Sequence, residues 1–192
     1  MKLIILDRDG VINQDRDDFV KSADEWIPIE GSMDAIAFLT QAGYTVAVAT
    51  NQSGIGRKYF TVQDLTEMHA KMHRLAVQAG GTIDGIWFCP HTAADNCDCR
   101  KPKPGMIYDI LERFKANPTE TWLVGDSLRD LQAIDAAGGK SALVLTGKGK
   151  KTLSQQEKEL PENTQIFDNL LAFSQYIMHE TAQDCADGQA NP

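Results

Sequence analysis

The chain has 192 residues, which favours a single domain that is long enough to bury a sizeable hydrophobic core. Its formal net charge of −8 argues against nucleic acid as the main ligand, because nucleic-acid-binding proteins carry basic patches. No stretch approaches the roughly 20 apolar residues of a membrane-spanning helix, and the first residues do not resemble a signal peptide. We therefore expect a cytoplasmic protein without a membrane partner.

Short apolar runs alternate with amphipathic stretches along the chain. In chain order they predict a strand over 2–6, a helix over 32–42, a strand over 44–49, a helix over 61–79, a strand over 83–88, a helix over 105–115, a strand over 121–124, a helix over 127–137, a strand over 141–145 and a weaker strand over 165–167. Thr61 and Asp64 form a helix-start pattern at the second of these helices.

Most of the expected strands are rich in Val, Ile and Leu without a clean alternation of apolar and polar residues. That pattern is typical of parallel strands that are covered on both faces. Strands that alternate with helices predict right-handed crossovers and a doubly wound parallel sheet, in an α/β fold. We expect one domain over 1–179. Residues 180–192 are polar, small and acidic, so we expect a disordered tail in which Cys185 is an incidental exposed thiol.

Four polar segments follow predicted strands, at the edge where an open α/β sheet binds ligands. The segments are DRDG at 7–10, TNQSG at 50–54, RKPKPGM at 100–106 and GDSLRD at 125–130. In the first segment, Asp7 and Asp9 repel each other unless a positive charge lies between them. A hard cation with oxygen ligands, such as Mg²⁺, would relieve that repulsion.

A second group of residues has the chemistry of a metal site. Cys89, His91, Cys97 and Cys99 lie close together in the sequence and offer three thiolates and one imidazole, a set suited to tetrahedral zinc. Four protein ligands leave no open position, so the expected role of zinc is structural. The ion would fix the loop 89–99.

The four segments, in this order, resemble those of the haloacid dehalogenase-like (HAD) phosphohydrolase superfamily, over about residues 2–146. The resemblance implies a Rossmannoid three-layer sandwich with a central parallel sheet, a zinc-binding loop and no large cap domain. It implies that Asp7 is the nucleophile, which attacks phosphorus to form an aspartyl-phosphate. It also implies that Asp9 is the general acid for the leaving alkoxide and then the general base for the hydrolytic water.

The resemblance also assigns roles that stabilise charge. Thr50 would donate a hydrogen bond to the phosphoryl oxygens, and Lys101 would neutralise their charge. Spacing alone does not distinguish Lys101 from Lys103, since both flank Pro102, and the resemblance favours Lys101.

The metal site implied by the resemblance uses two of the same acidic residues. Asp126 would complete the Mg²⁺ site together with the Asp7 carboxylate and the Asp9 backbone carbonyl. Asp130 is expected to orient Lys101 or a metal-bound water.

Two groups with a zinc loop are the nearest resemblances within the superfamily, the D-glycero-D-manno-heptose 1,7-bisphosphate 7-phosphatases and the histidinol-phosphate phosphatases. The runs TNQSGIGRKYF at 50–60, KPGM at 103–106 and LVLTGKG at 143–149 resemble the heptose group. The short segment 90–96 inside the zinc loop resembles the histidinol group and some heptose members. We expect the heptose activity, in a lipopolysaccharide or other surface-glycan pathway, with the preferred anomer left open and histidinol phosphate as the alternative substrate.

Two other classes are less compatible with the sequence. A nucleic-acid end phosphatase would share the fold and nucleophile, but the acidic balance of the chain counts against it. A non-catalytic sugar-phosphate-binding protein could dispense with Asp7 or Asp9, and both are present.

Without a cap insertion, the loops around the site must contact the substrate. Asp15, Asp17 and Asp18 could accept hydrogen bonds from sugar hydroxyls, and Arg57, Lys58 and Arg100 could meet a second phosphate. The predicted substrate-binding residues are Asp15, Asp18, Asn51, Gln52, Ser53, Arg57 and Arg100. The expected partner is a small phosphorylated sugar, and the chain is expected to be a monomer.

Overall fold

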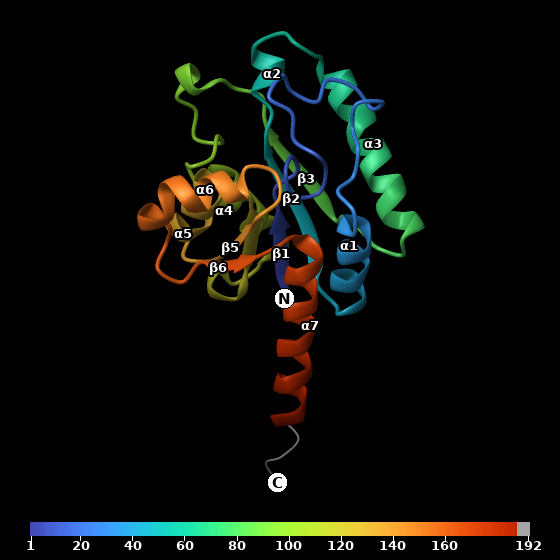
Figure 1. The fold of residues 1–192 in the computed structure, drawn as a ribbon, viewed down its shortest axis with the longest axis vertical. Helices are drawn as coiled ribbons and strands as arrows, with labels where there is room; N and C mark the ends of the chain where they lie inside the picture. Colours follow the sequence, from blue (N-terminus) through green and yellow to red (C-terminus); the bar gives the residue numbers. More distant parts are fainter. Residues whose placement is uncertain (188–192) are drawn as a thin grey trace.

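The computed structural model describes the backbone of residues 1–187 and the side chains of residues 1–180. In this part of the chain, six strands form one parallel sheet in the order β3-β2-β1-β4-β5-β6 (Figure 1). The strands are β1 Leu3–Leu6, β2 Thr45–Asn51, β3 Gly85–Cys89, β4 Trp122–Gly125, β5 Lys140–Val144 and β6 Gln165–Phe167.

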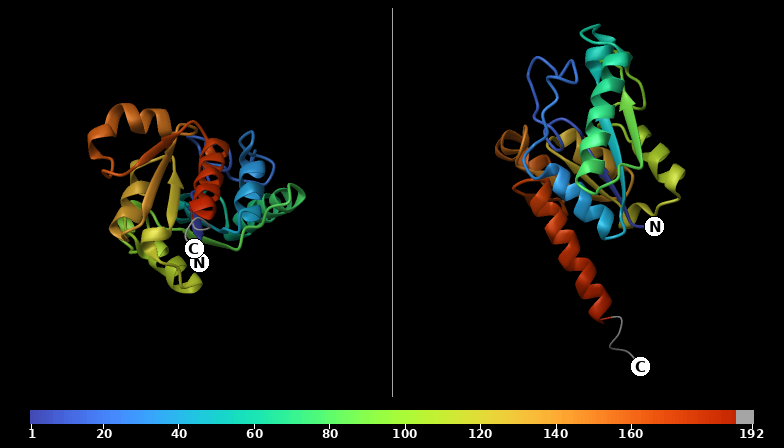
Figure 2. Two further views of the ribbon diagram at one scale, coloured as in Figure 1. Left: turned by 90° about the horizontal axis from the view of Figure 1, so that it is seen from below. Right: turned by 90° about the vertical axis from the view of Figure 1, so that its right-hand side faces the viewer.

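Helices cover both faces of this sheet (Figure 2). The α-helices are α1 Ser32–Gln41, α2 Ser53–Gly56, α3 Val62–Gln78, α4 Gly105–Phe114, α5 Leu128–Ala136, α6 Gly149–Gln156 and α7 Leu170–Asp187. Short 3₁₀ helices are η1 Ala93–Asp95, η2 Pro118–Glu120 and η3 Glu157–Glu159. Of the described helices, none has both the length and the apolar character that crossing a membrane would require.

The strand β1 shows why the fold has three layers. Its four residues are fully buried, and successive side chains point to opposite faces. Ile4 and Leu6 belong to the core shared with α1, α3 and α7, whereas Leu3 and Ile5 belong to the core shared with α4 and α5. The predicted three-layer α/β sandwich is therefore confirmed.

The order of the strands determines where a ligand can bind. Starting from β1, the chain builds the sheet first toward β3 and then, from β4 onward, in the other direction. A crevice forms at the carboxyl ends of the strands where this direction reverses. Leu6 pairs with Val48 of β2 and with Val124 of β4, so the segments that follow these three strands meet at one edge.

The observed elements differ from the prediction mainly at their ends. The third strand begins at Gly85 rather than at 83. At Asp84 the side-chain carboxylate, and not a backbone carbonyl, accepts the hydrogen bond from the Val46 amide, so the regular pairing of the two strands starts only after this residue. The second strand continues to Asn51, which pairs with Cys89 of β3. The short helix α2 and the helices α6 and α7 were not predicted.

The C-terminal segment is helical over part of the predicted tail. Helix α7 continues to Asp187 and projects from the body of the molecule (Figure 1). Residues 188–192 lie outside the described residues, as does the side chain of Cys185. The division into a domain over 1–179 and a disordered tail stays a prediction.

No cap domain lies between the first strand and the first helix in the described chain. Residues 13–31 form a loop. Two isolated β-bridges, from Asn13 to Asp9 and from Asn13 to Pro28, fix the start of this loop. The Ser32 hydroxyl donates a hydrogen bond of 2.7 Å to the Ile12 carbonyl and closes the loop at its base. In this part of the described chain, a loop rather than a cap domain lies at the carboxyl edge of the sheet.

Candidate active site

The polar segments predicted from the sequence meet in one cleft at the carboxyl edge of the sheet. Its volume is about 200 Å³. Asp7 follows β1 directly, Thr50 lies near the end of β2, and Asp126 follows β4. The predicted site residues that line the cleft are Asp7, Asp9, Asp15, Thr50, Asn51, Gln52, Ser53, Arg100 and Asp126.

Lys101 lies beneath the cleft in a shared ion pair. Its side chain is 1% exposed, and its Nζ lies 3.0 Å from Asp7 Oδ1 and 2.6 Å from Asp130 Oδ1. The same ammonium donates a hydrogen bond of 2.6 Å to the Ala49 carbonyl of β2. Burial opposes the charge of Lys101, but the carboxylates of Asp130 and Asp7 outweigh that effect and raise its pKa.

The neighbouring Lys103 points elsewhere. Its side chain is 42% exposed, and its Nζ contacts Asp98 and the backbone and side chain of Asn96. The structure therefore distinguishes the two lysines that the sequence spacing could not, and it places Lys101 against Asp7.

Three acidic residues at the floor of the cleft form a group that could hold a cation. Asp7, Asp126 and Asp130 each have a carboxylate oxygen within 4.8 Å of the others. Burial, followed by the negative charges of Asp130 and Asp7, raises the pKa of Asp126 to about 8. Burial also raises the pKa of Asp7 to about 6, although Lys101 opposes this shift. The floor of the cleft thus has three carboxyl groups against the single ammonium of Lys101. Carboxylate oxygens are ligands that suit a hard divalent cation.

The hydrogen bonds of these carboxylates indicate which oxygens are available. Asp130 is occupied, since Oδ1 pairs with Lys101 and Oδ2 accepts from the backbone and the hydroxyl of Ser127. Asp126 accepts one bond, from the Lys148 amide at 2.8 Å. Asp130 is thereby held as the partner of Lys101, whereas Asp126 and Asp7 are the better candidates for a metal ligand.

Asp9 is held by three side chains. Its carboxylate accepts two bonds of 3.0 Å from Arg8 Nη2, one of 2.9 Å from Asn13 and one of 2.8 Å from Gln52. Burial opposes its ionisation, but these donors lower the pKa of Asp9. Arg8 is fully buried and its Nη1 lies 3.4 Å from His69 Nε2. Burial and Arg8 lower the pKa of His69 to about 3, so this imidazole is neutral.

Two residues predicted to bind substrate also connect the segments to one another. Gln52 Nε2 donates to Asp9 and to the Thr50 hydroxyl, each at 2.8 Å. The Asn51 side chain exchanges two hydrogen bonds with the backbone of Lys101, at 3.0 and 3.1 Å. Gln52 and Asn51 therefore hold the catalytic candidates in place.

Only some of the loop residues that were predicted to bind the substrate line the cleft. Asp15 lines the cleft and forms an ion pair of 2.8 Å with Lys148. The side chain of Asp18 is 59% exposed, lies outside the cleft and pairs with Arg16 and Lys21 in its own loop. Arg57 is exposed at the end of α2 and does not line the cleft either.

Five cleft residues were not singled out by the sequence reasoning: Arg129, Lys148 and, in the loop before α1, Arg16, Phe19 and Val20. Arg129 lies within the fourth segment, two residues after the helix-capping Ser127. Lys148 follows β5, whose carboxyl end neighbours that of β4, so its place in the topology was a usable signal. Phe19 lies in the loop before α1, and no sequence pattern marked it.

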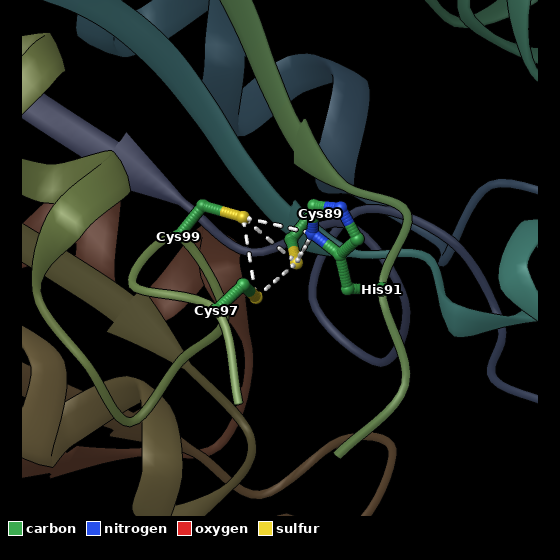
Figure 3. Close-up of side chains that lie close together, drawn as sticks. All are labelled: Cys89, His91, Cys97 and Cys99. Atoms are coloured by element: carbon green, nitrogen blue, oxygen red, sulfur yellow. Dashed lines mark hydrogen bonds between the residues drawn. The ribbon is translucent and has the colours of Figure 1, made fainter. Parts of the chain in front are cut away.

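The predicted zinc ligands converge on one centre at the end of β3 (Figure 3). Cys89 Sγ lies 3.1 Å from Cys99 Sγ and 3.6 Å from Cys97 Sγ, and His91 Nδ1 lies 3.3 Å from Cys99 Sγ. These three cysteines form no disulfide. Burial raises the pKa of the Cys89 thiol to about 12, which favours a protonated thiol unless a cation is bound. The donor set fits zinc.

This cluster is coupled to the cleft by direct contacts. Arg100 follows Cys99 and donates a hydrogen bond of 3.2 Å to the His91 carbonyl. The Pro90 carbonyl accepts a bond of 3.0 Å from the Gly56 amide of α2. The loop 89–99 therefore positions Arg100 and, one residue further on, Lys101.

Comparisons with known proteins agree with this geometry. A family model for haloacid dehalogenase-like hydrolases matches residues 2–138. The chain is 83% identical to a D-glycero-beta-D-manno-heptose-1,7-bisphosphate 7-phosphatase of Neisseria meningitidis serogroup A, over 97% of this chain and 100% of that protein. It is 52% identical to the protein of the same name from Pseudomonas putida, over 93% of this chain and 100% of that protein.

A solved structure is similar over nearly the whole chain. The D,D-heptose 1,7-bisphosphate phosphatase of B. bronchiseptica, complexed with magnesium and phosphate, superposes with a TM-score of 0.91 at 53% identity, over 94% of this chain and 99% of that chain.

Replacement of Lys101 by Met should lower the free energy of unfolding of the metal-free protein by about 3 kcal/mol at neutral pH, because Asp7 and Asp130 lose the cation that they share. Urea unfolding in the presence of a chelator measures the change. The control is Lys103→Met, whose exposed ion pair should contribute less than about 1 kcal/mol. Equal losses in the two variants would contradict the buried ion pair.

Proposed function

The chain belongs to the haloacid dehalogenase-like hydrolases, and we propose that it is a Mg²⁺-dependent phosphomonoesterase that removes the 7-phosphate of D-glycero-β-D-manno-heptose 1,7-bisphosphate. The observation that carries the proposal is the cleft itself. A buried carboxylate ion-paired to Lys101 faces the same space as Asp9, Thr50 and Asp126, in a chain that is 83% identical to a protein of that name. We propose the β-anomer as the substrate because the similar phosphatases carry that anomer in their names.

The first chemical step is attack by the Asp7 carboxylate on the 7-phosphorus. An O–P bond forms to Asp7, the bond from phosphorus to the sugar oxygen breaks, and Asp9 transfers a proton to the leaving alkoxide. Asp7 Oδ1 already accepts bonds from Lys101 and from the Arg8 amide, which fix the orientation of the carboxylate. A phosphate dianion beside Asp9 opposes its ionisation and so favours the protonated form required in this step.

The second step returns the enzyme to its starting state. Asp9, now a carboxylate, accepts a proton from water as the water oxygen attacks phosphorus and the Asp7–phosphate bond breaks. Inorganic phosphate leaves, and Asp7 is again a carboxylate. The bonds from Arg8, Asn13 and Gln52 favour the ionised form of Asp9 that this step needs.

Two residues stabilise the charge of the phosphoryl group. Because the Thr50 hydroxyl accepts a bond from Gln52, its own proton is left to donate to a phosphoryl oxygen. Lys101 supplies a fixed positive charge, held in place by Asp130 and the Ala49 carbonyl. Asp7, Asp126 and the Asp9 backbone carbonyl would hold Mg²⁺, which when bound offsets the repulsion between the phosphate dianion and the carboxylates.

We also propose a structural Zn²⁺ on Cys89, His91, Cys97 and Cys99. The support is the convergence of three free thiols and one imidazole, without an open position for a substrate. Free thiols suit a reducing compartment, so the proposed location is the cytoplasm. The proposed oligomeric state is a monomer.

The test of the proposed function is a panel of phosphomonoesters with Mg²⁺. It contains both anomers of the heptose 1,7-bisphosphate, histidinol phosphate and a phosphorylated oligonucleotide. The expected result is the highest kcat/KM for the β-anomer. A higher kcat/KM for histidinol phosphate would assign the alternative activity, for which the relatives give no support.

Replacement of Asp7 by Asn should reduce phosphate release by about 10³-fold or more, because the amide cannot form the aspartyl-phosphate. Circular dichroism should show an intact fold, since the two side chains have nearly the same shape. An exposed control is Asp98→Asn, which should retain full activity. Turnover of the Asp7 variant within tenfold of the parent protein would reject the covalent mechanism.

Metal analysis of the purified protein should find one zinc per chain. Cys97→Ala and Cys99→Ala should each lose that zinc and lower the melting temperature by roughly 5 °C or more, because the loop that carries Arg100 and Lys101 is released. Asp98→Ala, between the two cysteines, is the matched control and should keep both zinc and stability. A zinc-free protein of unchanged stability would refute the structural site.

A further inference from the structure

Arg8 stands between Asp7 and Asp9 in the sequence, yet its side chain does not line the cleft. It is fully buried and points toward α3, where its Nη1 lies 3.9 Å from Met68 Sδ and 3.4 Å from His69 Nε2. Its Nη2 lies 3.0 Å from each carboxylate oxygen of Asp9. The guanidinium therefore connects α3 to Asp9 and lies outside the space in which a substrate would bind.

The stability of the fold does not account for an arginine at this position. A fully buried guanidinium loses its hydration, and a buried ion pair is often no more stable than apolar side chains of similar volume. Arg8 Nε has no hydrogen-bond partner among the described residues. The side chain of Asp9, in contrast, is 22% exposed in the cleft, so its charge keeps part of its hydration without Arg8.

Asp9 is held at both of its carboxylate oxygens. Oδ1 accepts hydrogen bonds from Arg8 and Asn13, and Oδ2 accepts them from Arg8 and Gln52. Of these three donors, Arg8 alone contacts both oxygens. The torsion about the Cβ–Cγ bond of an aspartate has a broad energy profile, so contacts must set the orientation of the carboxyl plane. A donor that bridges the two oxygens opposes this rotation.

His69 in turn holds Arg8. Its ring is half-buried on α3 and packs edge-to-face against Phe88 of β3, with the ring centroids 6.4 Å apart. Because the imidazole is neutral, its Nε2 can accept a hydrogen bond from Arg8. A contact at the second terminal nitrogen restricts the rotation of the long Arg8 side chain. Two successive polar contacts therefore join α3 to Asp9.

We propose that Arg8, held by His69, is a positioning residue that keeps the Asp9 carboxyl group turned toward the leaving oxygen of the substrate. The inference rests on the proposed function, which assigns the proton transfer to Asp9. A general acid must lie within hydrogen-bond reach of the atom that it protonates, and a small displacement lowers the rate strongly. Since Arg8 does not touch the substrate, its loss should change kcat rather than KM.

The first test is Arg8→Met, which keeps a long side chain and removes the ion pair. For the heptose bisphosphate, kcat should fall about tenfold or more, while KM should change by less than about threefold. The melting temperature should fall by no more than about 3 °C, because a buried charge is removed and Asp9 stays partly hydrated. Arg8→Lys keeps the charge without the planar guanidinium and should give an intermediate kcat.

A second substrate separates an effect on Asp9 from an effect on Asp7, which accepts a hydrogen bond from the Arg8 amide. The leaving group of p-nitrophenyl phosphate needs no proton. With the enzyme in excess, release of p-nitrophenolate in a single turnover therefore measures attack by Asp7 without help from Asp9. Arg8→Met should leave this rate within about twofold of the parent protein. A loss as large as that of kcat on the heptose bisphosphate would overturn the inference.

A double-mutant cycle provides an independent test. When Asp9 is replaced by Asn, a residue that acts through the Asp9 carboxyl group has no further effect. Adding Arg8→Met to Asp9→Asn should therefore lower kcat by less than about twofold. The same loss in both backgrounds would show a general structural role for Arg8 and would overturn the inference.

The role of His69 is tested on its own helix. His69→Phe keeps an aromatic ring beside Phe88, removes the acceptor for Arg8 and should lower kcat about threefold. The matched control is His73→Phe, at an exposed position one turn further along α3, which should leave kcat unchanged. Equal kcat values for the two variants would overturn the support of Arg8 by His69.

Failure of the proposed function would be recognised separately. It would appear as absent turnover of the heptose bisphosphate by the parent protein, before any variant is compared. Normal turnover by the parent protein, together with an unchanged kcat in Arg8→Met, would leave the proposed function intact and overturn only the role of Arg8.

Discussion

The ion pair that Lys101 shares with Asp7 and Asp130 is the constraint on which the rest of the site depends. The ammonium joins the end of β1 to the first turn of α5, and its bond to the Ala49 carbonyl adds β2. Three separate segments are thereby fixed by one buried charge. Removing a partner from such a pair leaves an uncompensated buried charge, so the fold and the catalytic geometry are stabilised by the same contacts.

Lys101 can occupy this position only because the chain before it is held. Cys89 lies at the end of β3, beside Asn51 of β2, and the cluster of thiols and imidazole closes the loop as far as Cys99. The Asn51 side chain then donates a hydrogen bond to the Lys101 carbonyl and accepts one from the Lys101 amide. The predicted zinc site and the lysine proposed to act in catalysis are therefore parts of one continuous support, in which a distant structural ion would set the position of a charge beneath the cleft.

The sequence was a good guide wherever a residue's place follows from the topology. Asp7 and Asp126 follow parallel strands and Thr50 lies near the end of another, and such strands end at a common edge, so their meeting could be predicted. The choice between Lys101 and Lys103 depends on the path of a loop, and periodicity says nothing about that. Asp18 illustrates the same difficulty, because its charge is satisfied by Arg16 and Lys21 in its own loop rather than by a ligand.

A site without a cap domain must preform its mouth from loops, and contacts between those loops do this here. Asp15 and Lys148 join the loop after β1 to the loop after β5. Phe19, in the left-handed backbone region at φ 69°, packs its ring 5.3 Å from that of Tyr59, which follows α2. A bulky side chain rarely adopts that backbone conformation, and it persists only where the surroundings fix it. Because the loops hold one another, the charges of the mouth are already in place, and the cleft-lining guanidinium groups of Arg100 and Arg129 form no ion pair with a described carboxylate.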